Sequence, residues 1–212
     1  MALTFHYGSG SPFAWRVWLA LEHKKVPYQL EVLSFDRGDT KAPSFLAINP
    51  RGKVPTITHD GFNLWESLAI LEYLEERFPE PPLLPKDPKA RATTRRLMIE
   101  ADGDLAAAGR QLFEATLFAK EPVEPKALAE IHDGVVEQLQ RLEADLSGDY
   151  FTGALSLADF TIFPHLRLLR RVEDRQPGKG IGNRMPAKLA AWMKRIEALP
   201  YYQKTIPPHW KK

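Results

Sequence analysis

Two kinds of hydrophobic spacing divide the chain. Up to about residue 80, short apolar runs alternate between the two-residue period of strands and the three-to-four-residue period of helices. Asp60-Gly61 lies between two short apolar runs and favours a tight hairpin. The predicted order is strand, helix, strand, short helix, hairpin and helix, with a parallel first pair of strands. These elements are predicted over residues 3–7, 12–24, 28–35, 43–48, 56–65 and 66–78.

The rest of the chain predicts helices and no strand. Between residues 124 and 146, apolar side chains recur at steps of three and four, as on one buried helix face. The segment SLADF begins with a Ser-x-x-Asp spacing, a variant of the capping box that starts helices. We assign Ser156 and Asp159 to this structural cap rather than to chemistry. The helices are predicted over residues 88–118, 124–146, 156–169 and 186–198.

A proline-rich break separates the two patterns. Residues 78–88 read FPEPPLLPKDP and contain five prolines, which cannot continue a helix and stiffen an extended segment. We therefore predict an α/β domain over residues 1–80, a linker over 81–88 and an all-α domain over 89–212.

Composition excludes several kinds of chemistry. The chain has 212 residues, a net charge of +2 and no cysteine, so disulfides, thiolate metal sites and cysteine nucleophiles are excluded. Neither half has a large excess of one charge sign, and no apolar run approaches the ~20 residues of a membrane helix. The start, MALTFHYGSG, lacks the charged and apolar regions of a signal peptide. We expect a cytoplasmic protein without a nucleic-acid, membrane or metal partner.

The start of the first predicted helix raises a functional question. Ser11 precedes Pro12, and serine at the N-cap followed by proline is the usual beginning of a helix. Ser11 therefore has an ordinary structural role, and its hydroxyl is also placed where a helix attracts negative charge.

Longer motifs resemble a known family. The stretch NPRGKVPTITHDGFNLWESLAILEYLEERFP, followed in the helical half by TGALSLADF, is similar to the cytosolic glutathione transferases over nearly the whole chain. The resemblance implies a thioredoxin-like domain followed by a helical domain, usually paired as a homodimer. It also implies a detoxification enzyme that uses glutathione as co-substrate and keeps no permanently bound cofactor.

The segment SPFAWRV is similar to the serine-type tau and zeta classes. Their catalytic serine lies five residues before an arginine, as Ser11 does before Arg16. The sequence departs from the classes with a cysteine there and from the zeta isomerase pattern, in which a cysteine follows paired serines. Ser11 is therefore our candidate for the hydroxyl that stabilises the glutathione thiolate. Ser9 and Tyr7 remain alternatives, since other classes use a tyrosine at the end of the first strand.

Simple energetics support a hydroxyl in this role. Lowering a thiol pKa from about 8.5 by two units requires ~2.7 kcal/mol of preference for the thiolate. A hydrogen bond to a charged group provides ~1.5–3 kcal/mol, and a helix N-terminus adds ~0.3–1 kcal/mol. One hydroxyl at a helix start can therefore supply most of the shift without acting as a base.

The resemblance also implies where glutathione binds. A cis Val54-Pro55 bond would leave the Val54 N–H and C=O to pair with the cysteinyl backbone of the ligand; a plain trans proline at a strand edge is the alternative. Glu66 and Ser67, at a helix start, would receive the ammonium and the carboxylate of the γ-glutamyl group. Ordinary helix capping is the alternative for this pair.

Two lysines complete the predicted glutathione site. Lys41 and Lys53 would hold the glycyl carboxylate at the other end of the tripeptide, although either lysine alone is more often a surface charge.

The electrophile pocket has less specific candidates. Phe13 and Trp15 on the first helix, with Leu105, Ala108 and Leu112 on the long helix of the second half, would line it. Packing in the core is the alternative interpretation of every one of these residues.

Pairing of two chains has modest support from the residues. Apolar side chains lie outside a single stripe on two of the predicted helices, and Phe45 and Leu46 are predicted in a short exposed turn. In a homodimer, Asp102 or Asp104 would meet the γ-glutamyl ammonium across the interface. The alternative, which is the commoner case for either acid alone, is an ordinary solvated helix residue.

The predicted activity is conjugation of the glutathione thiolate to hydrophobic electrophiles, with reduction of hydroperoxides by the same thiolate. Alternatives are a non-catalytic binding or regulatory scaffold of the same fold, or a ligand carrier. The ending TIPPHWKK either folds over the site or the first domain, or frays.

Overall fold

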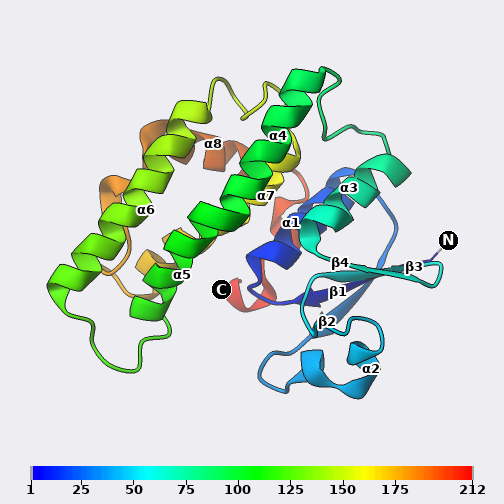
Figure 1. Ribbon diagram of the computed structural model, residues 1–212, viewed down its shortest axis with the longest axis horizontal. Helices are drawn as coiled ribbons and strands as arrows, with labels where there is room; N and C mark the ends of the chain where they lie inside the picture. Colours follow the sequence, from blue (N-terminus) through cyan, green and yellow to red (C-terminus); the bar gives the residue numbers. More distant parts are fainter. Residues whose placement is uncertain (1, 212) are drawn as a thin grey trace. The chain divides into compact units, whose positions relative to one another are not determined.

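The computed structural model describes residues 2–211, and its first part is built on a four-stranded sheet (Figure 1). The strands run in the order β2-β1-β3-β4. Strands β1 and β2 are parallel, as predicted, and the other two neighbouring pairs are antiparallel. The strands are β1 (Leu3–Gly8), β2 (Gln29–Leu33), β3 (Thr56–His59) and β4 (Phe62–Trp65).

The predicted hairpin joins β3 to β4. Asp60 has φ 51° and Gly61 has φ 84°, so both central residues adopt the left-handed conformation that a two-residue turn of this kind needs. The turn fixes the register, which pairs Thr56 with Trp65.

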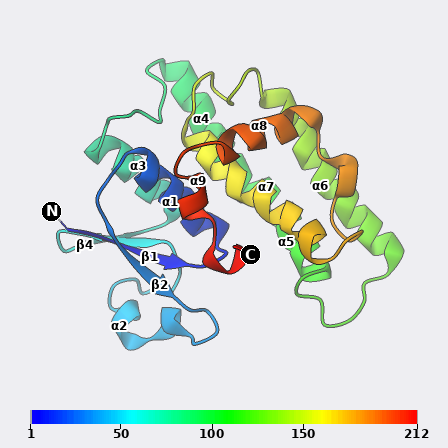
Figure 2. The same cartoon turned by 180° about the vertical axis from the view of Figure 1, so that it is seen from behind.

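Four helices belong to the same compact unit as this sheet. Helices α1 and α3 cover one face of the sheet, and α2 lies on the other face (Figure 1). The short α9 comes from the end of the chain and lies beside α1 (Figure 2). The helices are α1 (Pro12–His23), α2 (Pro43–Leu46), α3 (Ser67–Arg77) and α9 (Tyr202–Thr205), with 3₁₀ turns at Asp39–Lys41 and Pro208–Trp210.

A buried ion pair ties α1 to α3. The Lys24 ammonium lies 2.6 Å from the Glu75 carboxylate and also donates to the carbonyls of Phe78 and Pro81. Glu75 in turn accepts from the backbone N–H of Leu83. Each buried charge is thus paired and hydrogen-bonded, which is what makes its burial tolerable.

The second part of the chain is all helical, as predicted. The predicted helix over 88–118 is α4, then a π-helical turn, then α5. The helix that begins after Ser156 continues to Arg175, beyond its predicted end at 169. The elements are α4 (Pro88–Glu100), the π turn (Ala101–Leu105), α5 (Ala106–Ala115), α6 (Pro125–Asp145), α7 (Leu157–Arg175), a 3₁₀ turn (Gly182–Arg184) and α8 (Ala187–Glu197).

The chain divides into two compact units. The first comprises Met1–Leu83 together with Leu199–Lys212, and the second comprises Leu84–Ala198. Residues 199–211 therefore group with the sheet, whereas the sequence prediction placed them in the helical domain. The fold is the predicted one: a thioredoxin-like sheet with helices, and an all-helical part.

None of the helices within residues 2–211 is both long enough and apolar enough to cross a membrane.

Candidate active site

The turn between β1 and α1 presents Ser11. The Ser11 N–H donates to the Gly8 carbonyl at 3.1 Å, and the Ser11 hydroxyl accepts from the Ala14 N–H at 3.2 Å. Ser11 is thus the N-cap of α1, followed by Pro12 as predicted. A hydroxyl also has one proton to donate, so capping leaves that proton available for a second partner. The side chain is half-buried, at the positive end of a twelve-residue helix.

The two alternative hydroxyls have different surroundings. Tyr7 is 0% exposed and packs 4.8 Å, centroid to centroid, from Trp18. Burial raises the pKa of Tyr7 to about 12, so its phenol stays protonated and inside the core. The Ser9 hydroxyl is 2.7 Å from Nδ1 of His209.

A tightly hydrogen-bonded loop carries Val54. The Val54–Pro55 bond is cis. Within residues 2–211, no hydrogen bond uses the Val54 N–H or C=O, so both groups are available to a peptide-like ligand. The fully buried Asn49 donates to the Lys53 carbonyl at 2.8 Å and to the Thr56 hydroxyl at 3.0 Å. Sequence analysis did not single out Asn49, because its role depends on loop geometry.

The start of α3 lies on a buried guanidinium. Arg16 is 0% exposed, and its Nη1 donates to the Ser67 hydroxyl at 3.4 Å. Glu66 is exposed and has φ 67°, a strained conformation for a residue other than glycine. In the described chain, the N–H groups of Ser67, Leu68 and Ala69 carry no hydrogen bond. This helix end offers donors and positive potential to a carboxylate, beside the exposed carboxylate of Glu66.

The two predicted lysines flank the Val54 loop. Lys41 Nζ lies 3.3 Å from the Gly52 carbonyl, and both lysines are exposed. Gly52 has φ 58°, and a Cβ there would lie 2.7 Å from the Thr40 carbonyl oxygen, so only glycine fits. Lys41 and Lys53 thus belong to one loop region, in which the Lys41 ammonium donates to the loop backbone.

An aromatic side chain missed by sequence analysis lies at the same turn. A Cβ added to Gly8 would be 2.4 Å from the Phe35 ring and 2.8 Å from the Val54 side chain. Gly8 therefore lets Phe35 and Val54 approach the turn that carries Ser11. Phe35 is 53% exposed, although aromatic side chains are usually covered. No sequence signal marked it, because only the fold brings the loop after β2 to this turn.

The predicted electrophile-pocket residues divide between the two units. Trp15 is 1% exposed, and its indole N–H donates to the Thr205 hydroxyl at 3.1 Å, which favours the core interpretation. Phe13 is half-buried, with the Arg16 guanidinium 5.0 Å from its ring centroid. In the helical unit, Leu105 and Leu112 are buried in the core, and Ala108 is half-buried.

The residues that were predicted to take part in pairing of chains differ in exposure. The prediction that Phe45 lies in an exposed turn is wrong: it is 4% exposed and its ring is 5.7 Å from that of His6, edge to face. Asp102 lies 3.7 Å from His165 Nε2 within its own unit. Asp104 is exposed at the edge of a 280 Å³ cavity between α4 and α6.

Asp159 forms the predicted cap of α7. The capping box with Ser156 is present. The carboxylate also accepts from the Trp192 indole N–H at 2.8 Å and the Phe151 N–H at 3.3 Å. Asp159 is 0% exposed, and burial raises its pKa to about 6 against these donors. It ties three segments of the helical unit together.

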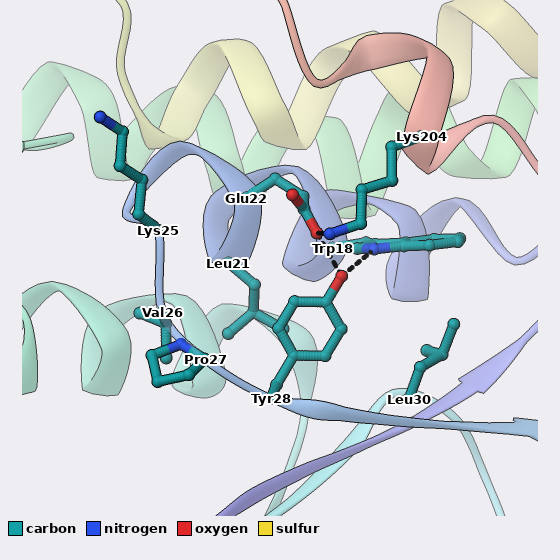
Figure 3. Close-up of a pocket in the computed structure, with 9 residues that line it drawn as sticks. All are labelled: Trp18, Leu21, Glu22, Lys25, Val26, Pro27, Tyr28, Leu30 and Lys204. Atoms are coloured by element: carbon teal, nitrogen blue, oxygen red, sulfur yellow. Dashed lines mark hydrogen bonds and ion pairs between the residues drawn. The ribbon is translucent and has the colours of Figure 1, made fainter.

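A cavity of 530 Å³ opens beside the C-terminal half of α1 (Figure 3), and Ser11 does not line it. Four of its polar side chains are bonded to one another: the Trp18 indole N–H donates to the Tyr28 hydroxyl, which donates to Glu22, and Lys204 pairs with Glu22 at 2.6 Å. None of the predicted glutathione contacts lines it. We therefore place the candidate site at the Gly8–Ser11 turn and not in this cavity.

Comparison with known proteins identifies the class. Residues 10–77 match the N-terminal domain of glutathione S-transferases, and residues 125–195 match their C-terminal domain. The sheet with its Val54 loop and the all-helical second unit thus define a glutathione S-transferase fold. The chain belongs to the glutathione S-transferase family.

Individual relatives span most of the chain. Maleylacetoacetate isomerase from Rattus norvegicus is 33% identical over 74% of this chain and 73% of its own. Glutathione S-transferase A from Pleuronectes platessa is 29% identical over 98% and 92%. A solved glutathione S-transferase from the Antarctic clam Laternula elliptica is 30% identical, covers 99% of this chain and 94% of its own, and has a TM-score of 0.87. These homologues are enzymes, and glutathione conjugation is consistent with this membership.

Proposed function

We propose that this protein is a glutathione transferase in which the Ser11 hydroxyl stabilises the bound thiolate. The observation that carries the proposal is the contrast among three hydroxyls. Ser11 caps α1 and keeps a proton to donate at the positive end of that helix, whereas Tyr7 is buried and Ser9 lies before the cap, against the His209 ring. Charge-assisted hydrogen bonds of this kind are the stronger ones.

The proposed binding mode uses one end of the first unit. The Val54 backbone pairs with the cysteinyl residue, and the start of α3 with Glu66 and Ser67 receives the γ-glutamyl group. Lys41 and Lys53 attract the glycyl carboxylate. These groups orient the tripeptide so that its sulfur lies at Ser11, which converts binding energy into positioning.

The proposed reaction follows from the thiolate. Glutathione loses its thiol proton to solvent, and Ser11 stabilises the resulting anion. The sulfur attacks an electrophilic carbon, the C–S bond forms, and a halide or similar group leaves with its electron pair. With a hydroperoxide, the thiolate attacks the terminal oxygen, the O–O bond breaks and the alkoxide leaves as an alcohol after taking a proton from solvent. The sulfenic acid that forms reacts with a second glutathione to give the disulfide and water.

The relatives support a second candidate. Identity of 33% to a maleylacetoacetate isomerase over 74% of the chain favours isomerisation of maleylacetoacetate at the same site. The absence of cysteine separates this chain from the isomerase pattern in which a cysteine follows paired serines. We therefore rank conjugation first and include maleylacetoacetate as a substrate in the test.

The test begins with retention on immobilised glutathione, followed by turnover with an aryl halide. Ser11→Ala should lower kcat by about 10- to 100-fold, a loss of ~1.4–2.7 kcal/mol of transition-state stabilisation, with little change in the KM for glutathione. Ser11→Thr, which keeps both cap and hydroxyl, should retain more activity. Binding without turnover would instead support the non-catalytic scaffold. An active Ser11→Ala enzyme combined with an inactive Ser9→Ala or Tyr7→Phe enzyme would show that another hydroxyl acts.

A further inference from the structure

The last residues of the described chain contact the turn that carries Ser11. The 3₁₀ turn Pro208–Trp210 follows α9, beside α1 (Figure 2), and belongs to the same compact unit. His209 Nδ1 is 2.7 Å from the Ser9 hydroxyl, two residues before Ser11. This contact joins positions 200 residues apart in the sequence.

The hydrogen bonds of His209 define its tautomer. The Trp210 indole N–H lies 2.9 Å from His209 Nε2, and an indole nitrogen can only donate. Nε2 must therefore be the acceptor, so in the neutral ring the proton is on Nδ1 and is donated to the Ser9 oxygen. Ser9 thus accepts through a lone pair and is held in one orientation.

Packing holds the Pro208–Trp210 segment against both the Gly8–Ser11 turn and helix α1. Gly10 has φ 90°, and a Cβ there would lie 3.0 Å from His209 Cε1, so the imidazole lies directly against the Gly10 backbone. The Trp210 ring meets Trp15 edge to face at 5.4 Å. Because Trp15 is buried in α1, the segment is anchored to the helix that Ser11 caps.

We propose that His209 is a positioning residue for the thiolate site. By donating to Ser9 and packing on Gly10, it fixes the Gly8–Ser11 turn and thereby the direction of the Ser11 hydroxyl. This inference rests on the proposed function, in which Ser11 stabilises the thiolate. Preorganised donors act strongly because they need no rearrangement during reaction, and a small displacement of such a group costs rate.

The experiment compares substitutions that remove or keep the donor. His209→Leu removes it, whereas His209→Asn keeps a side-chain N–H near the position of Nδ1. The pKa of bound glutathione is read from the ultraviolet absorbance of its thiolate, with kcat and KM measured alongside. We expect His209→Leu to raise this thiol pKa and lower kcat by about 3- to 30-fold, with the KM for glutathione unchanged. His209→Asn should recover most of the loss.

A matched control and a double substitution separate positioning from general damage. His132 in α6 is a half-buried histidine whose Nε2 lies 3.0 Å from the Lys179 carbonyl, and His132→Leu should behave like the parent. Ser9→Ala should reproduce the His209→Leu effect, and the two together should cost no more than either alone. Additive losses, a parent-like thiol pKa in His209→Leu, or failure of His209→Asn to recover activity would overturn the inference.

The outcomes also distinguish this inference from the proposed function. If Ser11→Ala leaves the bound thiol pKa unchanged, the proposed function is wrong. If Ser11→Ala raises the thiol pKa while His209→Leu does not, only the positioning role of His209 is wrong. Thermal unfolding of each variant shows whether the first unit remains folded during the measurement.

Discussion

At the scale of single residues, the Ser67 side chain supports both the fold and the proposed ligand. Ser67 is buried, accepts from the buried Arg16 guanidinium and begins α3, where three N–H groups are available within the described chain. The γ-glutamyl carboxylate would therefore bind a prearranged set of donors. These donors should bind the carboxylate more strongly than an exposed charged side chain would, because salt screens exposed charges most.

Ser67→Ala should weaken glutathione binding by about 5- to 100-fold, since a poorly paired polar group costs ~1–3 kcal/mol. Affinity for cysteinylglycine, which lacks the γ-glutamyl group, should hardly change. Isothermal titration calorimetry with both ligands measures the ratio of the two affinities. Ser44→Ala on the exposed surface of α2 is the matched control. Equal affinity of the Ser67→Ala and parent proteins for glutathione would contradict the assignment.

Phe35 is expected to favour aromatic electrophiles. Its half-exposed ring lies against Gly8 and Val54, beside the proposed position of the sulfur. An aromatic pair contributes ~0.5–1.5 kcal/mol beyond burial. Phe35→Ala should therefore lower kcat/KM for an aryl halide about 2- to 10-fold and leave a small non-aromatic electrophile unaffected.

A second aromatic residue provides the control for Phe35. Phe62 on β4 is 51% exposed, against 53% for Phe35, so Phe62→Ala removes a comparable ring from another part of the first unit. If both variants lose aryl halide activity equally, or if both substrates respond equally to Phe35→Ala, the ring has no selective role.

Local residue patterns explain why some contacts could be predicted and others could not. Ser11 and Asp159 were found because a cap is a signal over three or four neighbouring residues. Asn49 acts through a loop, and Phe35 and His209 meet the Gly8–Ser11 turn only after the chain has folded. No spacing in one sequence records such contacts.

At the scale of elements, helix α7 depends on a buried acid. Its pKa of about 6 lies above the ordinary value of 3.8, so between these pH values the folded chain binds more protons than the unfolded chain. Stability from this group is therefore fully present below about pH 4 and is lost as the pH rises through about 6. The carboxylate remains ionised at neutral pH, where its four donors partly compensate for burial.

Asp159→Asn removes this titration while keeping the shape of the side chain. The difference in unfolding free energy between parent and variant should change by roughly 2–3 kcal/mol between pH 4 and 6, in the direction of lower parent stability at higher pH. Denaturant unfolding at several pH values measures it. Asp174→Asn, an exposed acid on the same helix, should show no such trend, and activity per folded Asp159→Asn molecule should be normal. A stable but inactive variant would reverse the structural assignment.

Element boundaries were harder to predict than element types. The long helix after Pro88 contains a π turn at Ala101–Leu105, which inserts a residue into the helical repeat without changing the apolar pattern noticeably. Helix α7 continues through a charged run because Val172 is buried and keeps that run attached to the core. Tertiary packing decides both features, whereas the strands and the hairpin follow from their own local patterns.

At the scale of the whole molecule, we expect two copies to pair. Large apolar side chains remain exposed on the helical unit, with Ile99 at 65% and Phe118 at 72%, and a twofold pair would cover the same surface on each copy. Light scattering at micromolar concentration should give a mass near twice 24.1 kDa. A mass near 24.1 kDa with full glutathione turnover would show that one chain suffices.

The first unit consists of two separate stretches of the chain, so the order of synthesis affects when it can be completed. Domains generally fold as units during synthesis, the N-terminal one first. Here the residues that pack on the Gly8–Ser11 turn are translated only after the entire second unit, because 199–212 follow it in the chain. A nascent chain can form the sheet early, but it cannot secure the turn that holds Ser11 until the ribosome has passed the last helix of the second unit.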